Sequence, residues 1–174
     1  MEQTIRTLAC LNSHSFVAKL DEVRLRNGRI SDRIKIDHPQ AVAVIPLVDP
    51  EHVLMVKQYR YALGFETWEI PAGKMDQGED ELTCGQRELM EETGYQAAKL
   101  THLLSYYPAI GYSDEIIHIY LAPQVIKSVD QVDEDEISAV EVVALSKIKD
   151  MIRRGEIMDG KTILGISLLS GALD

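Results

Sequence analysis

Hydrophobic and polar side chains alternate along much of the chain, which is the pattern of β-strands with one buried face. Over residues 15–36 this alternation continues on both sides of Asn27-Gly28, a pair typical of a type I′ turn, and predicts an antiparallel meander. Residues 41–45 are continuously apolar, as expected of a strand buried on both faces. Further strands are predicted at residues 53–56, 67–70, 100–106, 116–121 and 140–145.

Helical spacing of apolar residues occurs in three stretches, residues 80–93, 146–154 and 162–173. The first has Asp80 as its expected N-cap and Gly94 as its left-handed stop. Strands with a few interleaved helices predict an α/β (α+β) fold with a mixed central sheet. A boundary near His38-Pro39 divides the chain into an expected N-terminal β-sheet unit, residues 1–38, and a main domain, residues 39–174.

Composition narrows the function classes. With 45% hydrophobic and 26% charged residues the chain is an ordinary globular protein, and its net charge of −10 argues against broad binding of nucleic acid. The apolar run at residues 41–48 is broken by Pro46 and is too short to span a membrane. The N-terminus lacks the pattern of a secretory signal, so a cytoplasmic protein is expected. The two cysteines and five histidines show no ligand spacing, and we assign them no chemistry.

The helix expected at residues 80–93 carries a cluster of carboxylates. At 100° per residue, Glu88, Glu91 and Glu92 share one face. Like charges at this spacing destabilise an isolated helix by ~0.2–0.5 kcal/mol per pair, unless a cation binds them. Such clusters are commonly no more than solvated faces, but the preceding glycine-containing loop and the adjacent Arg87 favour a site for a hard divalent cation.

This stretch resembles the Nudix box, Gly-x5-Glu-x7-Arg-Glu-U-x-Glu-Glu-x-Gly-U, where U is bulky and apolar. The positions in register are Gly73, Glu79, Arg87, Glu88, Leu89, Glu91, Glu92, Gly94 and Tyr95. Two departures are Tyr95, where an aliphatic residue is commoner, and Gly85, which weakens the helix by ~1 kcal/mol relative to alanine. The resemblance implies a Nudix-type α/β/α sandwich that hydrolyses a pyrophosphate bond.

The resemblance also implies the metal ligands, which are the backbone carbonyl of Ala72 and the carboxylates of Glu88, Glu91 and Glu92. The expected ion is Mg²⁺, for which Mn²⁺ can substitute. Arg87 is expected to orient these carboxylates by salt bridges rather than to touch the substrate.

Segments outside the box resemble one branch of the family, the ADP-ribose and nucleoside diphosphate sugar pyrophosphatases. They are Gln58-Tyr59-Arg60, residues 68–73 and residues 160–164. In that branch an N-terminal β unit helps to form a homodimer, and residues 1–38 are expected to play that role here. The implied substrate contacts are Arg60, Glu69, Gly73, Ile110, Gly111 and Glu115, with Arg60 suited to pair bidentately with phosphate oxygens. Ile110 stands where ADP-ribose hydrolases commonly carry a marker proline.

The branch takes its general base from an acidic loop before a late strand, which corresponds to residues 132–136. The loop is separated from the strand by additional residues, so both Glu134 and Glu136 stay candidates, and a solvated acidic turn is the alternative for either. Glu136 is preferred because it lies nearer the strand that would anchor the loop.

The expected function is therefore metal-dependent hydrolysis of ADP-ribose to AMP and ribose 5-phosphate, or of a related nucleoside diphosphate sugar such as GDP-mannose. A function from a different class is a Nudix-fold module that senses a nucleotide without cleaving it. The intact Glu88, Glu91 and Glu92 argue against that alternative.

Overall fold

The computed structural model describes residues 1–129, 137–169 and 171, and these form two compact units. The first unit comprises Met1–Gln40 together with Tyr106–Ile116, and the second comprises Ala41–Ser105 and Ile117–Asp174. The division at residue 40 lies close to the expected boundary at residue 38. The inclusion of Tyr106–Ile116 in the first unit was not expected from the sequence.

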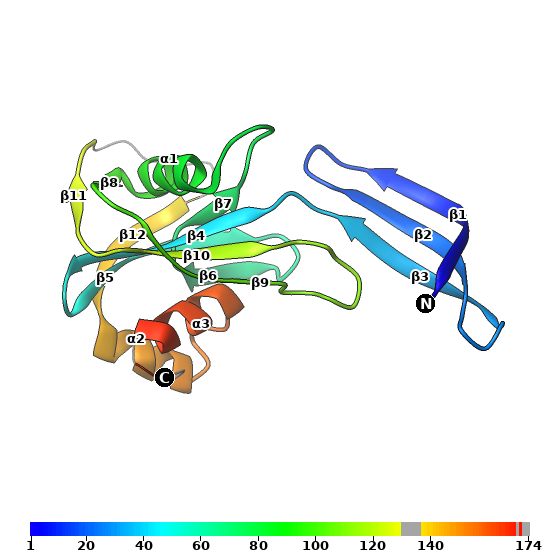
Figure 1. Ribbon diagram of the computed structural model, residues 1–174. Helices are drawn as coiled ribbons and strands as arrows, with labels where there is room; N and C mark the ends of the chain where they lie inside the picture. Colours follow the sequence, from blue (N-terminus) through cyan, green and yellow to red (C-terminus); the bar gives the residue numbers. More distant parts are fainter. Residues whose placement is uncertain (130–136, 170, 172–174) are drawn as a thin grey trace. The chain divides into compact units, whose positions relative to one another are not determined.

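The first unit is built on a three-stranded antiparallel sheet, in the order β1 (Gln3–Asn12), β2 (Val17–Arg24) and β3 (Ile30–Asp37) (Figure 1). The meander expected at residues 15–36 corresponds to β2 and β3. Strand β1 was not predicted, because its large apolar residues Ile5, Leu8 and Leu11 recur every third position. Its pairing with β2 is also irregular, with register shifts between Thr4 and Arg6 and between Thr7 and Ala9.

The turn between β2 and β3 corrects one expectation. A type I′ turn needs positive φ at both Asn27 and Gly28, yet only Gly28 has it, at 84°. Gly28 N donates to Leu25 O at 2.9 Å and Leu25 N donates to Arg29 O at 2.8 Å. These bonds define a three-residue loop, a type I turn closed by a glycine bulge, so the glycine was identified correctly and the turn type was wrong.

The second unit contains a mixed sheet whose main path runs β12-β5-β4-β10-β9, with β6 beside β5 and β7 beside β4. Strand β4 pairs in parallel with β10 and antiparallel with β5 and β7. The bounds are β4 (Ala41–Asp49), β5 (His52–Arg60), β6 (Phe65–Glu69), β7 (Ala72–Lys74), β9 (Thr101–Tyr106), β10 (Ile117–Ala122) and β12 (Ile137–Ala144). A separate pair is formed by β8 (Tyr95–Ala97) and β11 (Val125–Lys127).

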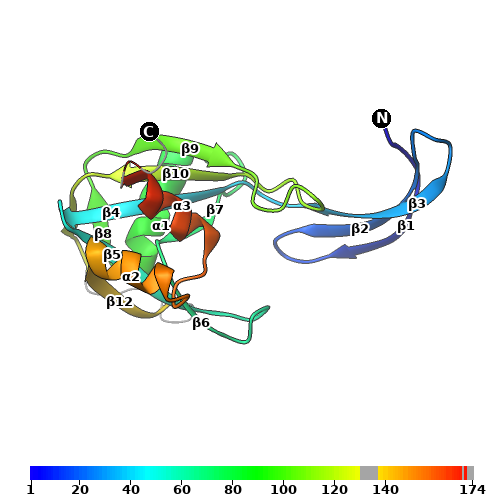
Figure 2. The same ribbon diagram turned by 90° about the horizontal axis from the view of Figure 1, so that it is seen from below.

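Three helices cover this sheet: α1 (Glu81–Thr93) lies on one face, and α2 (Leu145–Arg153) and α3 (Gly160–Leu169) lie on the other (Figures 1 and 2). The sheet is the middle layer, and β4 lies inside it, between β5 and β10. A Cβ placed at Gly85 of α1 would lie 3.1 Å from Val42, and one at Gly165 of α3 would lie 3.0 Å from Ile45. The two glycines therefore let both helices approach β4 closely, and the expected α/β/α sandwich is confirmed.

The ends of α1 follow from local chemistry. Asp80 caps the helix by accepting a hydrogen bond from Thr83 N at 2.9 Å, and Gly94 ends it in the left-handed conformation with φ 74°. Both were predicted. Among the helices of the described chain, none combines the length and hydropathy needed to cross a bilayer.

Candidate active site

The carboxylates of α1 meet the loop and strand that precede the helix. Glu92 Oε2 accepts a hydrogen bond from Ala72 N at 3.0 Å. Glu88 lies over Gly73, so closely that a Cβ at Gly73 would fall 1.9 Å from the Glu88 carboxyl carbon. The fold therefore brings together three of the four groups expected to hold a metal, and it explains why a glycine occupies position 73.

Arg87 organises the outer side of this cluster. Its guanidinium binds both carboxylate oxygens of Glu79 at 2.9 Å, Glu88 Oε1 at 2.7 Å and Glu91 Oε2 at 3.0 Å, and it donates to Lys74 O at 3.1 Å. Glu79 in turn accepts from Asp76 N at 3.0 Å. The Arg87 guanidinium thus bonds three carboxylates at once, which is the geometry of a residue that orients carboxylates.

Burial raises the pKa of two of these carboxylates, Glu92 and Glu88. Glu92 is 6% exposed, and loss of hydration raises its pKa to about 8 against the single backbone donor at Ala72. Burial also raises the pKa of Glu88, although Arg87 opposes the shift. By contrast, the hydrogen bonds from Arg87 hold the pKa of Glu79 at about 2.

The donor set fits a hard divalent cation. Carboxylate and carbonyl oxygens are the ligands that such ions take, and a cation would relieve the desolvation that raises the pKa of Glu92 and Glu88. Ala72, Glu88, Glu91 and Glu92 could supply these oxygens. The Gly73 backbone leaves room for the Glu88 carboxylate beside the loop, which a larger residue would fill.

A second ionic cluster lies at the end of β6. Glu69, which is 2% exposed, accepts hydrogen bonds from Arg60 at 2.7 and 2.5 Å, from Thr67 and from Lys161. Burial would raise the pKa of Glu69, but the hydrogen bonds and charges of Arg60 and Lys161 outweigh it and bring the pKa down to about 2. The expected substrate residues Arg60 and Glu69 are thus paired with each other.

Lys161 was not identified as a site residue from the sequence. It lies at the start of α3, is 7% exposed and also contacts Asp159 Oδ2 at 3.1 Å. The neighbouring Thr162 accepts a hydrogen bond from Ile70 N at 2.9 Å, which fixes α3 to the chain just before Ala72 and Gly73. The available signal was a lysine at the start of an otherwise apolar helical stretch.

Comparison with known proteins gives the family of this chain. The NUDIX domain model matches residues 37–161, which include both ionic clusters. The chain belongs to the NUDIX family. A NUDIX relative from Bacillus subtilis, an ADP-ribose pyrophosphatase, is 40% identical over 152 residues, which are 86% of this chain and 82% of that protein.

Two further comparisons extend over nearly the whole NUDIX chain. A methanol dehydrogenase activator from Bacillus methanolicus is 37% identical over 170 residues, which are 97% of this chain and 92% of that protein. A crystal structure of an ADP compounds hydrolase superposes with a TM-score of 0.83 at 20% identity and covers 99% of this chain and 94% of that one. The second comparison supports the fold, including the N-terminal sheet.

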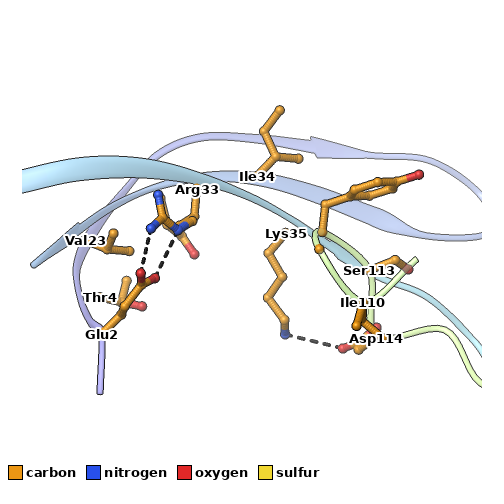
Figure 3. Close-up of a pocket in the computed structure, with 12 residues that line it drawn as sticks. Glu2, Thr4, Val23, Arg33, Ile34, Lys35, Ile110, Ser113 and Asp114 are labelled. Carbon is orange, nitrogen blue, oxygen red and sulfur yellow. Dashed lines mark hydrogen bonds and ion pairs between the residues drawn. The ribbon is translucent and has the colours of Figure 1, made fainter. Parts of the chain in front are cut away.

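The remaining expected substrate residues lie in the first unit of the NUDIX chain. Ile110 (82% exposed) and Gly111 line a pocket of about 310 Å³, in which Arg33 points toward Glu2 and Lys35 toward Asp114 (Figure 3). The Lys35–Asp114 pair measures 3.4 Å. Glu115 lies 3.7 Å from His38. The two candidates for the general base, Glu134 and Glu136, fall outside the described residues.

Proposed function

We propose that this NUDIX protein hydrolyses the pyrophosphate bond of ADP-ribose, giving AMP and ribose 5-phosphate, or of a related nucleoside diphosphate sugar. The observation that carries the proposal is the carboxylate cluster of Glu88, Glu91 and Glu92 against the Ala72-Gly73 backbone, oriented by Arg87. The ADP-ribose pyrophosphatase at 40% identity supports the choice of substrate.

The metal ligands of this proposal are Ala72 O, Glu88, Glu91 and Glu92, and the ion is Mg²⁺, or Mn²⁺ in its place. A bound ion supplies charge neutralisation on the diphosphate and a lower pKa of the attacking water. Arg87 holds Glu88 and Glu91 in place from the outer side, and Glu79 fixes Arg87. Hydrolysis forms a bond from the water oxygen to phosphorus, breaks the anhydride P–O bond and delivers one proton to a base.

Substrate recognition is assigned to Arg60, Glu69 and Gly73 of the main domain. Since Arg60 already forms a bidentate pair with Glu69, its guanidinium is fixed in direction and keeps an exposed side for phosphate or ribose oxygens. Ile110, Gly111 and Glu115 are assigned to the part of the substrate that distinguishes one sugar from another.

A panel assay tests the activity. The protein is incubated with ADP-ribose, GDP-mannose, other nucleotide sugars, dinucleotides and nucleoside triphosphates in magnesium, and the products are separated by chromatography. We expect AMP and ribose 5-phosphate from ADP-ribose. Cleavage of GDP-mannose alone would assign the second substrate and make Ile110→Pro the next variant. Nucleotide binding without turnover of any substrate would support the sensing module and overturn the proposal.

The general base is assigned to Glu136, with Glu134 as the second candidate. Loss of a general base lowers kcat by ~10²–10⁴ with little change in KM. Glu136→Gln and Glu134→Gln are therefore compared with Glu141→Gln, a change at an exposed position of β12 that should leave kcat unchanged. Full kcat in both loop variants would exclude the loop and make Glu115 the next candidate.

We also propose a homodimer built through the N-terminal sheet. Every residue of β1 is exposed, and its apolar residues Ile5, Leu8 and Leu11 keep 43%, 46% and 74% of their surface accessible. A small isolated sheet with such a surface is marginal in water and gains stability from a partner. Light scattering at micromolar concentration should give twice 19.5 kDa, and a mass of 19.5 kDa would exclude the dimer.

A further inference from the structure

A second group of metal-ligating side chains lies in the main domain, apart from the NUDIX carboxylates. Glu81 comes from the first turn of α1, His102 from β9 and His118 from β10, and one ligand atom of each lies within 4.8 Å of the others. His118 is 7% exposed, whereas His102 is open to solvent. This group has no signature in the sequence, because its members are separated by 21 and 16 positions.

Two neighbouring side chains tie the group together. Ser105 Oγ lies 2.9 Å from His102 Nε2 and 2.7 Å from His118 Nδ1, so a single hydroxyl bridges the two rings. His118 Nδ1 lies 3.6 Å from Glu81 Oε1. The other oxygen of Glu81 accepts a hydrogen bond from the Tyr120 hydroxyl, and the Tyr120 ring packs edge-on against His102 at 5.2 Å.

The donor set differs in kind from the NUDIX site. Two imidazole nitrogens and one carboxylate oxygen suit zinc and other divalent transition metals, whereas the cluster of Glu88, Glu91 and Glu92 offers only oxygen. The Tyr120–Glu81 hydrogen bond is the outer support that carboxylate ligands have in metal sites. We propose that Glu81, His102 and His118 bind a divalent transition-metal ion, with one coordination position left for water.

The three ligand atoms need to move only slightly closer together to bind an ion. Zinc holds nitrogen and oxygen ligands at ~2.0–2.2 Å, which places tetrahedral ligands about 3.4 Å apart. The widest pair lies within 4.8 Å and must therefore approach by at most about 1.4 Å. His102 can supply this movement because it is exposed on β9, at the end of the strand order. The Ser105 hydroxyl then gives up one or both of its bonds to the rings.

The ion would link β9 to β10 and to the start of α1. Glu81 precedes Glu88 by seven residues, which is about 10 Å along the helix axis. The proposed site is therefore separate from the carboxylates that face Ala72 and Gly73, and it does not depend on the proposed hydrolase activity.

Equilibrium dialysis against zinc, in millimolar magnesium to occupy the oxygen ligands, tests the site. The wild type should bind one zinc that His102→Ala binds at least about 100-fold more weakly, the upper end of the loss found even for outer-shell partners. Because His102 is exposed, this variant should fold; zinc should also raise the Tm of the wild type and not that of the variant. His52→Ala, which removes a histidine paired with Asp49 on another strand, is the matched control and should bind zinc as the wild type does.

Two further variants separate a metal site from a hydrogen-bonded cluster. Ser105→Ala should keep zinc binding, because the hydroxyl is not a required ligand, and Glu92→Gln should keep it as well. X-ray absorption of the wild-type zinc complex should show two imidazole ligands. Equal zinc affinity in the wild type and His102→Ala, or loss of zinc in Glu92→Gln with an all-oxygen spectrum, would overturn the proposal.

Discussion

Glu69 and Glu92 are both buried carboxylates of the same domain, yet their surroundings are opposite. Glu69 accepts hydrogen bonds from Arg60, Thr67 and Lys161, and the two cations, Arg60 and Lys161, hold its pKa at about 2 despite its burial. Glu92 has one backbone donor, Ala72 N, and burial raises its pKa to about 8. Position within the fold therefore decides whether a buried glutamate is neutralised by the protein or left for a cation from outside.

The difference separates the ion pairs around Glu69, which support the fold, from the carboxylates of Glu88 and Glu92, which form the proposed metal site. The ion pairs of Glu69 with Arg60 and Lys161 connect β6 to β5 and to the start of α3. They therefore fix the end of β6, from which the chain continues to Ala72. The carboxylates of Glu88 and Glu92 face that loop, and burial raises the pKa of both.

Glu92→Gln should lower kcat by ~10²–10⁴, because a metal ligand contributes several kcal/mol to the stabilisation of the transition state. The variant should fold, since glutamine keeps an oxygen that can accept from Ala72 N. Steady-state kinetics on ADP-ribose measure the effect, and wild-type protein in excess chelator should show a similar loss. Near-native rates in both samples would mean that the carboxylate face is not the metal site.

Glu69→Gln should lower the free energy of unfolding by up to ~3–5 kcal/mol, because it removes the buried carboxylate that Arg60 and Lys161 share and leaves Lys161 with Asp159 alone. Urea denaturation measures this change. The control is Glu66→Gln, which removes an exposed pair with Lys57 and should shift the unfolding midpoint very little. If both variants unfolded at the same urea concentration, the cluster at Glu69 would have no supporting role.

Magnesium should stabilise the wild type by about 2.7 kcal/mol at a concentration 100 times the dissociation constant. The gain should be larger at pH 8 than at pH 6, since the ion competes with the proton that the raised pKa of Glu92 retains. Thermal unfolding with and without magnesium measures the gain. Glu92→Gln should lose most of it, while an equal gain in the variant would place the ion elsewhere.

Metal-free protein should lose stability as the pH rises from about 4.5 to 8. A carboxyl group whose pKa is raised by folding favours the folded state while it is protonated, and this contribution disappears as the pH passes the folded pKa of about 8. Glu92 can contribute a slope of at most ~1.4 kcal/mol per pH unit, and Glu88 adds to it with the same sign. Glu69 contributes no slope in this range, because its contribution is lost only as the pH falls from about 4.5 toward 2.

Urea titrations at several pH values in chelator measure that slope. Glu92→Gln should flatten it relative to the wild type. An unchanged slope in the variant would mean that Glu92 is ionised throughout this range and would remove the contrast with Glu69.

Features that depend on neighbouring residues could be predicted from the sequence alone. The bounds of α1, its Asp80 cap, its Gly94 stop and its shared carboxylate face all follow from helical periodicity and local hydrogen bonds. The buried strand at residues 41–45 and the family resemblance followed from similarly short stretches. The irregular strand β1 was missed because its pairing, and not its pattern, makes it a strand.

Contacts between distant positions could not be predicted from the sequence, because they depend on how the chain folds. Lys161 meets Glu69 across 92 residues, and Tyr120 meets Glu81 across 39. The opposite pKa shifts of Glu69 and Glu92 depend on whether Arg60 and Lys161 hydrogen-bond the carboxylate directly, as they do at Glu69, or act on it by charge alone, as they do at Glu92. The histidines became a candidate site for the same reason, because strand pairing brings His102 and His118 beside the start of α1 although their spacing in the sequence carries no metal-binding pattern.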